Sequence, residues 1–133
     1  MRKSFLFSVF LFGYLLSMVS YAADPVVTDG DKYKVILENE RVRVYKYDDK
    51  PGDKTHMHDH NDFTLYALAP FKRKLTFADG KSITRQFKAG EIIWMKKQTH
   101  LGENIGTTDT HVIIVELKEP PLAAGKKSES SFK

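Results

Sequence analysis

The chain has 133 residues, a formal net charge of +4 and no cysteine. A charge balance this close to neutral argues against a nucleic-acid-binding surface, which needs clustered basic residues. The lack of cysteine excludes disulfides and thiolate ligands, so any metal site must use histidine, carboxylate or backbone oxygen.

The first 22 residues have the pattern of a secretory signal peptide. The basic start Met1-Arg2-Lys3 precedes an almost wholly apolar run from Phe5 to Val19, and Ser20 and Ala22 are the small residues before a cut after Ala22. The apolar run of about 15 residues is shorter than the roughly 20 that span a bilayer. We therefore expect cleavage rather than an uncleaved membrane anchor, and a periplasmic or secreted protein.

Cleavage would leave residues 23–133, with 19 basic against 17 acidic side chains once Arg2 and Lys3 are removed. That length predicts one small domain with one core, which we place at residues 23–119. Residues 120–133, PPLAAGKKSESSFK, offer little apolar surface to bury, so we expect a disordered tail.

Short alternating runs separated by turn residues follow a polar lead over residues 24–31. The predicted strands are Lys34–Leu37, Arg41–Tyr47, the histidine stretch from His56, Phe63–Leu68, Lys74–Phe77, Ser82–Phe87, Glu91–Met95 and Thr110–Leu117. Asp79-Gly80 is typical of a hairpin turn, and no long helical pattern occurs between residues 32 and 119. Many short strands with frequent turns predict an all-β sandwich or barrel.

The stretch HMHDH places His56, His58 and His60 at alternate positions. On a regular strand all three point to one face. Adjacent ones are about 7 Å apart and can converge on one ion, whereas the outer two are about 13 Å apart. Either His56 with His58 or His58 with His60 is therefore the candidate ligand pair, and the alternative is an exposed polar run without function.

A metal site needs a further ligand from elsewhere in the chain. His100 follows the apolar run that ends at Met95, and we expect it in the loop after that strand, where it can turn back across a barrel. The alternative is an ordinary loop histidine.

Two segments resemble the two motifs of the cupins. Gly52, five residues, His58, one residue and His60 resemble the first motif, and Gly90 with His100 and Asn104 resembles the second. The resemblance covers about residues 35–118. It implies a double-stranded β-helix, or jelly-roll, barrel with His58, His60 and His100 as metal ligands inside it and His56 as a flanking residue.

The chain departs from the cupin motifs in its ligands. The carboxylate that the first motif carries would fall at Thr64 or Leu65, and neither is acidic. The second motif usually has Pro and Gly where this chain has Lys96 and Gln98. A three-histidine site suits Fe, Mn, Ni, Cu or Zn rather than Mg or Ca, and the sequence does not choose among those five metals.

Three further residues are candidates for the pocket or for contacts with the ligands. In Thr110–Leu117, Thr110 and Glu116 suggest an outward face, so His111 is expected to point into the barrel. There it would be a hydrogen-bonded core histidine, a partner of a ligand, or an acid–base group. Trp94 is expected in the core with a place at the pocket, and Thr64 is expected beside the site.

The resemblance implies a metal-dependent, oxygenase-like enzyme acting on a small molecule. The alternative is a non-catalytic cupin that binds a metal or a small molecule in the periplasm, and the least favoured reading makes the histidines incidental. A homodimer is also expected, with Lys34–Leu37 as a strand that can add to a partner's sheet. No nucleic-acid partner and, after cleavage, no stable membrane anchor are expected.

Overall fold

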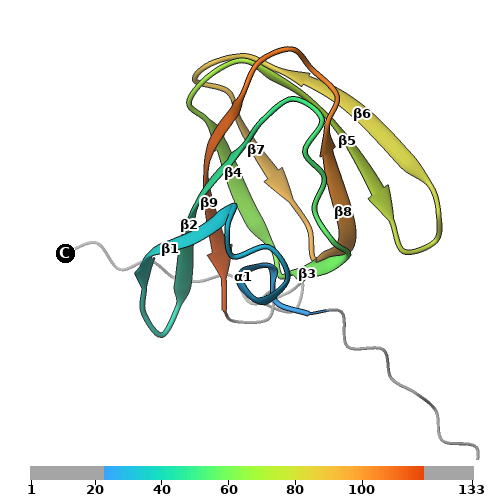
Figure 1. The fold of residues 1–133 in the computed structure, drawn as a ribbon. Coiled ribbons are helices and arrows are strands. Elements are labelled where there is room, and N and C mark those ends of the chain that lie inside the picture. The colour runs from blue at the N-terminus through green and yellow to red at the C-terminus, as the bar shows by residue number, and fades with distance from the viewer. Residues whose placement is uncertain (1–22, 119–133) are drawn as a thin grey trace, which may run out of the picture.

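The computed structural model describes residues 23–118, which form one short helix and nine strands (Figure 1). In chain order the elements are α1 (Pro25–Thr28), β1 (Tyr33–Glu38), β2 (Val42–Asp49), β3 (His58–His60), β4 (Phe63–Ala67), β5 (Phe71–Phe77), β6 (Ser82–Phe87), β7 (Ile92–Met95), β8 (Gln98–Asn104) and β9 (Thr110–Leu117). The expected signal peptide and disordered tail lie outside the described residues.

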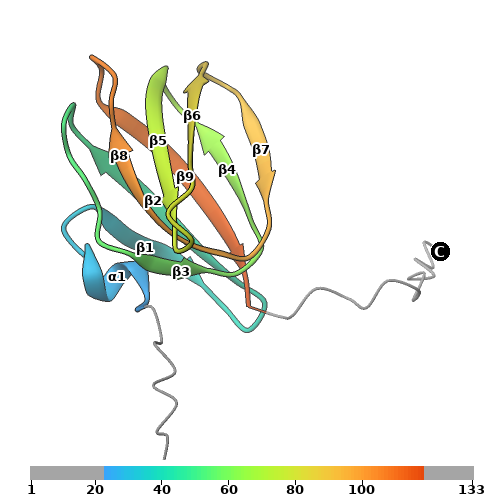
Figure 2. The ribbon, with the colours of Figure 1, turned by 90° about the vertical axis from the view of Figure 1, so that its right-hand side faces the viewer.

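The strands form two antiparallel sheets that face each other (Figures 1 and 2). One sheet has the order β1-β2-β9-β4-β7 and the other has the order β3-β8-β5-β6. The core between them is rich in aromatic side chains: Tyr33, Tyr45, Tyr47, Phe63, Phe71 and Phe87, with Ala67, Val112 and Ile114. The expected all-β double-stranded barrel is confirmed.

The inward face of β9 is the opposite of the predicted one. Thr110, Val112, Ile114 and Glu116 are buried, and His111 lies on the outer face with 45% of its side chain exposed. There its Nδ1 lies 2.6 Å from an oxygen of Asp48. The prediction that His111 points into the barrel was wrong, because it assumed that a glutamate faces water, whereas Glu116 has a hydrogen-bonding partner inside.

Thr64 and Trp94 also lie on the outer face. They are partners in the pairing of β4 with β7, and Trp94 is 52% exposed. Their strand neighbours Phe63 and Met95 point inward and line the cavity. Because side chains alternate along a strand, these apolar neighbours leave Thr64 and Trp94 outside. The expected pocket roles of both residues are therefore corrected.

His100 lies in strand β8, a strand that the sequence did not predict. Residue by residue, β3 pairs with β8, and His58 lies opposite His100. The sequence of β8, QTHLGEN, lacks apolar alternation because its buried positions are His100, Gly102 and Asn104. Hydrophobic periodicity therefore does not predict this strand. The same sheet pairing begins only at His58, so His56 precedes the regular strand.

The segment before β1 closes one end of the barrel beside β3 (Figure 2). An oxygen of Asp24 accepts a 2.9 Å hydrogen bond from the Val26 amide, and Pro25 follows at the first helical position, so this short sequence starts a helix well. The helix ends at Asp29, which is 2% exposed. Within residues 23–118, no helix has the length and apolar character needed to cross a bilayer.

Candidate metal centre

Three histidines from two neighbouring strands converge inside the barrel. His58 and His60 extend from β3 and His100 from β8, and each offers a ring nitrogen within 4.8 Å of the others. Their exposed fractions are 0%, 2% and 4%. The cross-strand pairing of His58 with His100 brings the third ring to the first two. The three residues that the sequence singled out are therefore brought together.

The ring of His58 is oriented by its own chain. Its Nδ1 donates a 2.8 Å hydrogen bond to the carbonyl oxygen of His56, so the proton is on Nδ1 and Nε2 carries a lone pair. The hydroxyl of Tyr33 lies 3.2 Å from that Nε2 and donates to it. Nε2 of His58 is thus the nitrogen available to an ion.

The ring of His60 is oriented by a carboxylate. Its Nδ1 lies 2.5 Å from Oε2 of the buried Glu116, and the hydroxyl of Tyr45 contacts the other oxygen at 3.4 Å. A carboxylate that accepts from one imidazole nitrogen fixes the ring and makes the other nitrogen a better ligand. Glu116 therefore supports the site without facing it.

Burial keeps two of the rings neutral. It lowers the pKa of His58 to about 4, and the neighbouring His60 adds to the effect. Burial likewise lowers the pKa of His100 to about 2, with further contributions from His60, His58 and Arg73. Within the described residues, the buried Nδ1 of His100 has no hydrogen-bond partner. Both rings hold free lone pairs at neutral pH, as metal ligation requires.

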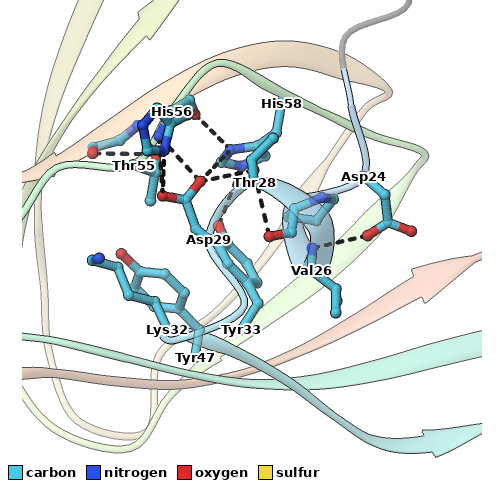
Figure 3. A network of polar contacts seen from close by, with 12 residues as sticks. Asp24, Val26, Thr28, Asp29, Lys32, Tyr33, Tyr47, Thr55, His56 and His58 are labelled. Carbon is cyan, nitrogen blue, oxygen red and sulfur yellow. Dashed lines mark hydrogen bonds and ion pairs between the residues drawn. The ribbon is translucent and has the colours of Figure 1, made fainter.

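His56 flanks the cluster rather than joining it, as the resemblance implied. Its ring is 78% exposed, and its Nδ1 lies 3.0 Å from the buried carboxylate of Asp29 (Figure 3). The same carboxylate accepts from the His56 amide at 3.0 Å and from the Thr28 hydroxyl at 2.8 Å. Asp29 thereby fixes the backbone whose carbonyl orients His58.

A cavity adjoins the histidines and extends between the two sheets. The cavity volume is about 80 Å³, several times what one water molecule needs. Its lining is largely apolar, with His60, His100, Tyr33, Tyr47, Arg73, Arg85 and Thr110 as polar members. An ion held by the three histidines would therefore lie beside space for a small molecule.

The donor set fits a transition metal. Three imidazole ligands suit Zn, Cu, Fe or Ni, and they leave coordination positions for water or another ligand. The set does not select one of these metals.

Sequence reasoning found the three histidines but missed Glu116, Asp29, Tyr33 and Arg73. A carboxylate within the apolar run VIIVEL was the one available signal for Glu116.

Comparison with protein-family models and with curated proteins found no match. Solved structures do match. A cupin domain from Bordetella pertussis is 26% identical, with a TM-score of 0.60 over 65% of this chain and 92% of that one.

Two more distant structures share the fold. An RmlC-like cupin with a double-stranded β-helix fold from Methanocaldococcus jannaschii is 16% identical, with a TM-score of 0.52 over 64% of this chain and 77% of that one. The polyketide cyclase RemF from Streptomyces resistomycificus is 18% identical, with a TM-score of 0.51 over 68% and 66%. These two likenesses show the fold, and the Bordetella match together with the two facing sheets shows that the chain belongs to the cupin superfamily.

Proposed function

We propose that the protein is a metal-dependent enzyme, oxygenase-like in its ligand set, that acts on a small molecule outside the cytoplasm. The observation that carries this proposal is a cluster of three buried histidines next to a cavity. Nδ1 of His100 is buried without a partner among the described residues, and a buried polar atom of this kind is costly unless a ligand satisfies it. The signal-like start of the sequence supports export.

The residues of the site have two roles, as ligands of the ion and as groups that orient the ligands. His58, His60 and His100 would hold the ion, while Glu116 and the carbonyl of His56 keep two of the rings turned toward it. A bound metal supplies Lewis acidity or activates water or dioxygen. The Tyr33 hydroxyl contacts His58 and lines the cavity, so it can donate a hydrogen bond to a ligand there.

The first test is metal content. The purified exported protein should carry close to one metal ion per chain by elemental mass spectrometry, either as isolated or after reconstitution with Fe(II), Mn, Ni, Cu or Zn. His58→Ala and His100→Ala should each reduce the content at least tenfold. His111→Ala, a histidine on the outer face, is the matched control and should not change it.

Two outcomes would contradict the proposal. No bound metal in the wild-type protein after reconstitution would remove the metal site altogether. Stoichiometric metal without consumption of dioxygen or turnover across a panel of small molecules would favour the non-catalytic alternative, a cupin that binds a metal or a small molecule.

We also propose a homodimer formed through β1. This strand is at the edge of its sheet, and Val35, Ile36 and Leu37 are 39%, 55% and 51% exposed. An edge strand with unpaired backbone groups and three exposed apolar side chains supports antiparallel addition of a second copy. Sedimentation analysis should give a dimer for the wild type and a monomer for Ile36→Lys; a wild-type monomer at 100 μM would contradict this.

A further inference from the structure

Arg73 is an arginine buried inside the barrel. It is 8% exposed, it faces inward from β5, and it lines the same cavity as His60 and His100. An arginine cannot lose its charge in a protein, so burying it is costly unless its donors are satisfied. The position of this charge in the cavity wall therefore needs an explanation.

The protein satisfies only part of the guanidinium. Nη1 donates to Oδ2 of Asp49 at 2.6 Å, and Nη2 donates to the hydroxyl of Tyr47 at 2.7 Å. An arginine has five N–H groups. Three of them therefore have no partner among the described residues, although the side chain is more than nine-tenths buried and lines the cavity.

The guanidinium is held rigidly. The Tyr47 hydroxyl also donates to Asp49, the other oxygen of Asp49 accepts from the Asn104 amide at 3.1 Å, and the Tyr47 ring lies 4.7 Å from the guanidinium carbon. Such a group needs little reorganisation to bind a ligand, so less affinity is lost on binding.

Gly102 determines where the guanidinium lies. A Cβ at this position would be 2.3 Å from Nη2, 2.5 Å from Nε and 2.7 Å from Cζ of Arg73, so only glycine lets the group lie against β8. The Nε–Nη2 edge of the guanidinium therefore lies against this strand, and the second N–H of Nη1 is the free donor left for a ligand. Gly102 is two residues from His100, a spacing of about 7 Å along a strand. An anionic group held by Arg73 would consequently lie next to the histidine cluster.

The rest of the cavity calls for an apolar ligand. The hydrophobic side chains that line it are Phe63, Leu65, Phe71, Leu75, Ile83, Phe87, Ile93, Met95, Val112 and Ile114. Phe71 and Phe87 stack in it, with ring centroids 4.4 Å apart. Contact with an apolar ligand is favourable here because it removes apolar area from water, whereas such a surface offers no hydrogen bonds to a polar ligand.

We propose that the cavity binds a small amphipathic acid, with its carboxylate on the remaining N–H of Arg73 Nη1 and its apolar body against the hydrophobic wall. Charge-assisted hydrogen bonds from a guanidinium to a carboxylate are short and strong. The head group would lie within reach of the histidine cluster. This proposal names the substrate class of the proposed function, but it is tested without metal and so can fail or hold by itself.

The test compares two ligands of the same chain length on the metal-free protein. By isothermal titration calorimetry, octanoate should bind at least tenfold tighter than 1-octanol. Acetate, which has the head group without the apolar body, should bind at least tenfold more weakly than octanoate. Equal affinities for octanoate and octanol, or no binding of octanoate, would overturn the proposal.

A conservative variant separates binding from a merely structural ion pair. Arg73→Lys keeps the charge next to Asp49 but loses the planar set of donors. Its octanoate affinity should fall at least fivefold while its octanol affinity stays within twofold. An unchanged ratio of the two affinities in Arg73→Lys would overturn the assignment to Arg73.

Two controls complete the experiment. His111→Ala, on the outer face, should bind octanoate as the wild type does, and thermal unfolding should show that Arg73→Lys is folded at the temperature of the titration. Metal content is measured separately on the same samples. An octanoate preference in a protein that binds no metal would support the acid site and contradict the proposed enzyme.

Discussion

The barrel holds two buried polar clusters that differ in how complete they are. In the cluster of His58, His60 and His100, the rings lie within reach of one ion, and His100 has a buried nitrogen without a partner among the described residues. In the cluster of Arg73 and Asp49, opposite charges meet at 2.6 Å. The first cluster requires something added to it, whereas the second is stable by itself and offers only its spare donors.

Removing the acid from the second cluster should have the largest effect on stability. Asp49→Ala leaves the charge of Arg73 buried without a counterion, which typically destabilises by about 3–5 kcal/mol. Urea denaturation measures the free energy of unfolding. The double variant Arg73→Met with Asp49→Ala should recover most of the loss, and a loss below about 1 kcal/mol in Asp49→Ala would mean that the two clusters differ less than the contacts indicate.

Acid should destabilise the first cluster and leave the second unchanged. The pKa of His58 is about 4 in the folded protein against an ordinary value of 6.5 in an unfolded chain, so between these pH values the unfolded chain takes up a proton that the fold excludes. Stability of the metal-free protein should therefore fall as pH decreases from 6.5 to 4, on the order of 3 kcal/mol in total. The lowered pKa of His100 adds to this loss of stability, and its effect continues below pH 4.

Urea midpoints measured from pH 7 to pH 4.5 test this dependence. The slope should be shallower in His58→Gln, which removes one of the depressed groups. A flat profile in the wild type would show that the histidines are more hydrated than their burial implies.

A smaller effect is expected from the carboxylate that orients His60. Glu116→Gln keeps a hydrogen-bond acceptor but removes the charge, and such changes next to a metal-bound histidine reduce affinity about 10- to 100-fold. Competition with a zinc-binding dye measures the affinity. Unchanged zinc affinity would mean that the 2.5 Å contact does not serve the metal site.

The smallest effect is expected at His56. Its ring is 78% exposed, and polar contacts of such exposed side chains contribute about 0–1 kcal/mol. His56→Ala should retain full metal content and lose less than about 1 kcal/mol of stability by urea denaturation. A loss of metal would place His56 among the ligands and overturn the choice of His58 with His60.

Local patterns predicted most of the fold. The Asp79-Gly80 turn and the alternating runs around it lie in the hairpin of β5 and β6, and β9 begins and ends where the alternation does. The polar strand β8 was missed because its inward residues serve the site instead of the core. The helix α1 was missed because four residues carry no periodicity.

The ligands of the candidate site were easier to predict than the residues that orient them. His58 and His60 alternate on one strand, and the motif spacing led to His100. Asp29 and Glu116 could not be found this way, because each meets its histidine only through the tertiary fold. The inward direction of Glu116 also runs against the rule that acids face water. Here a pairing inside the barrel outweighed that rule, and His111 was misplaced as a result.

The His60–Glu116 contact joins residues 56 positions apart in the chain, and Tyr33 reaches His58 across 25 positions. Contacts between such distant segments form late in folding, because the loops that they close must first be ordered. Pairing of the ligand strands β3 and β8 also joins distant segments, and by itself it leaves the rings free to rotate. A fully oriented site then exists only after both the first and the last strands have docked, so tight metal capture would report the completion of folding.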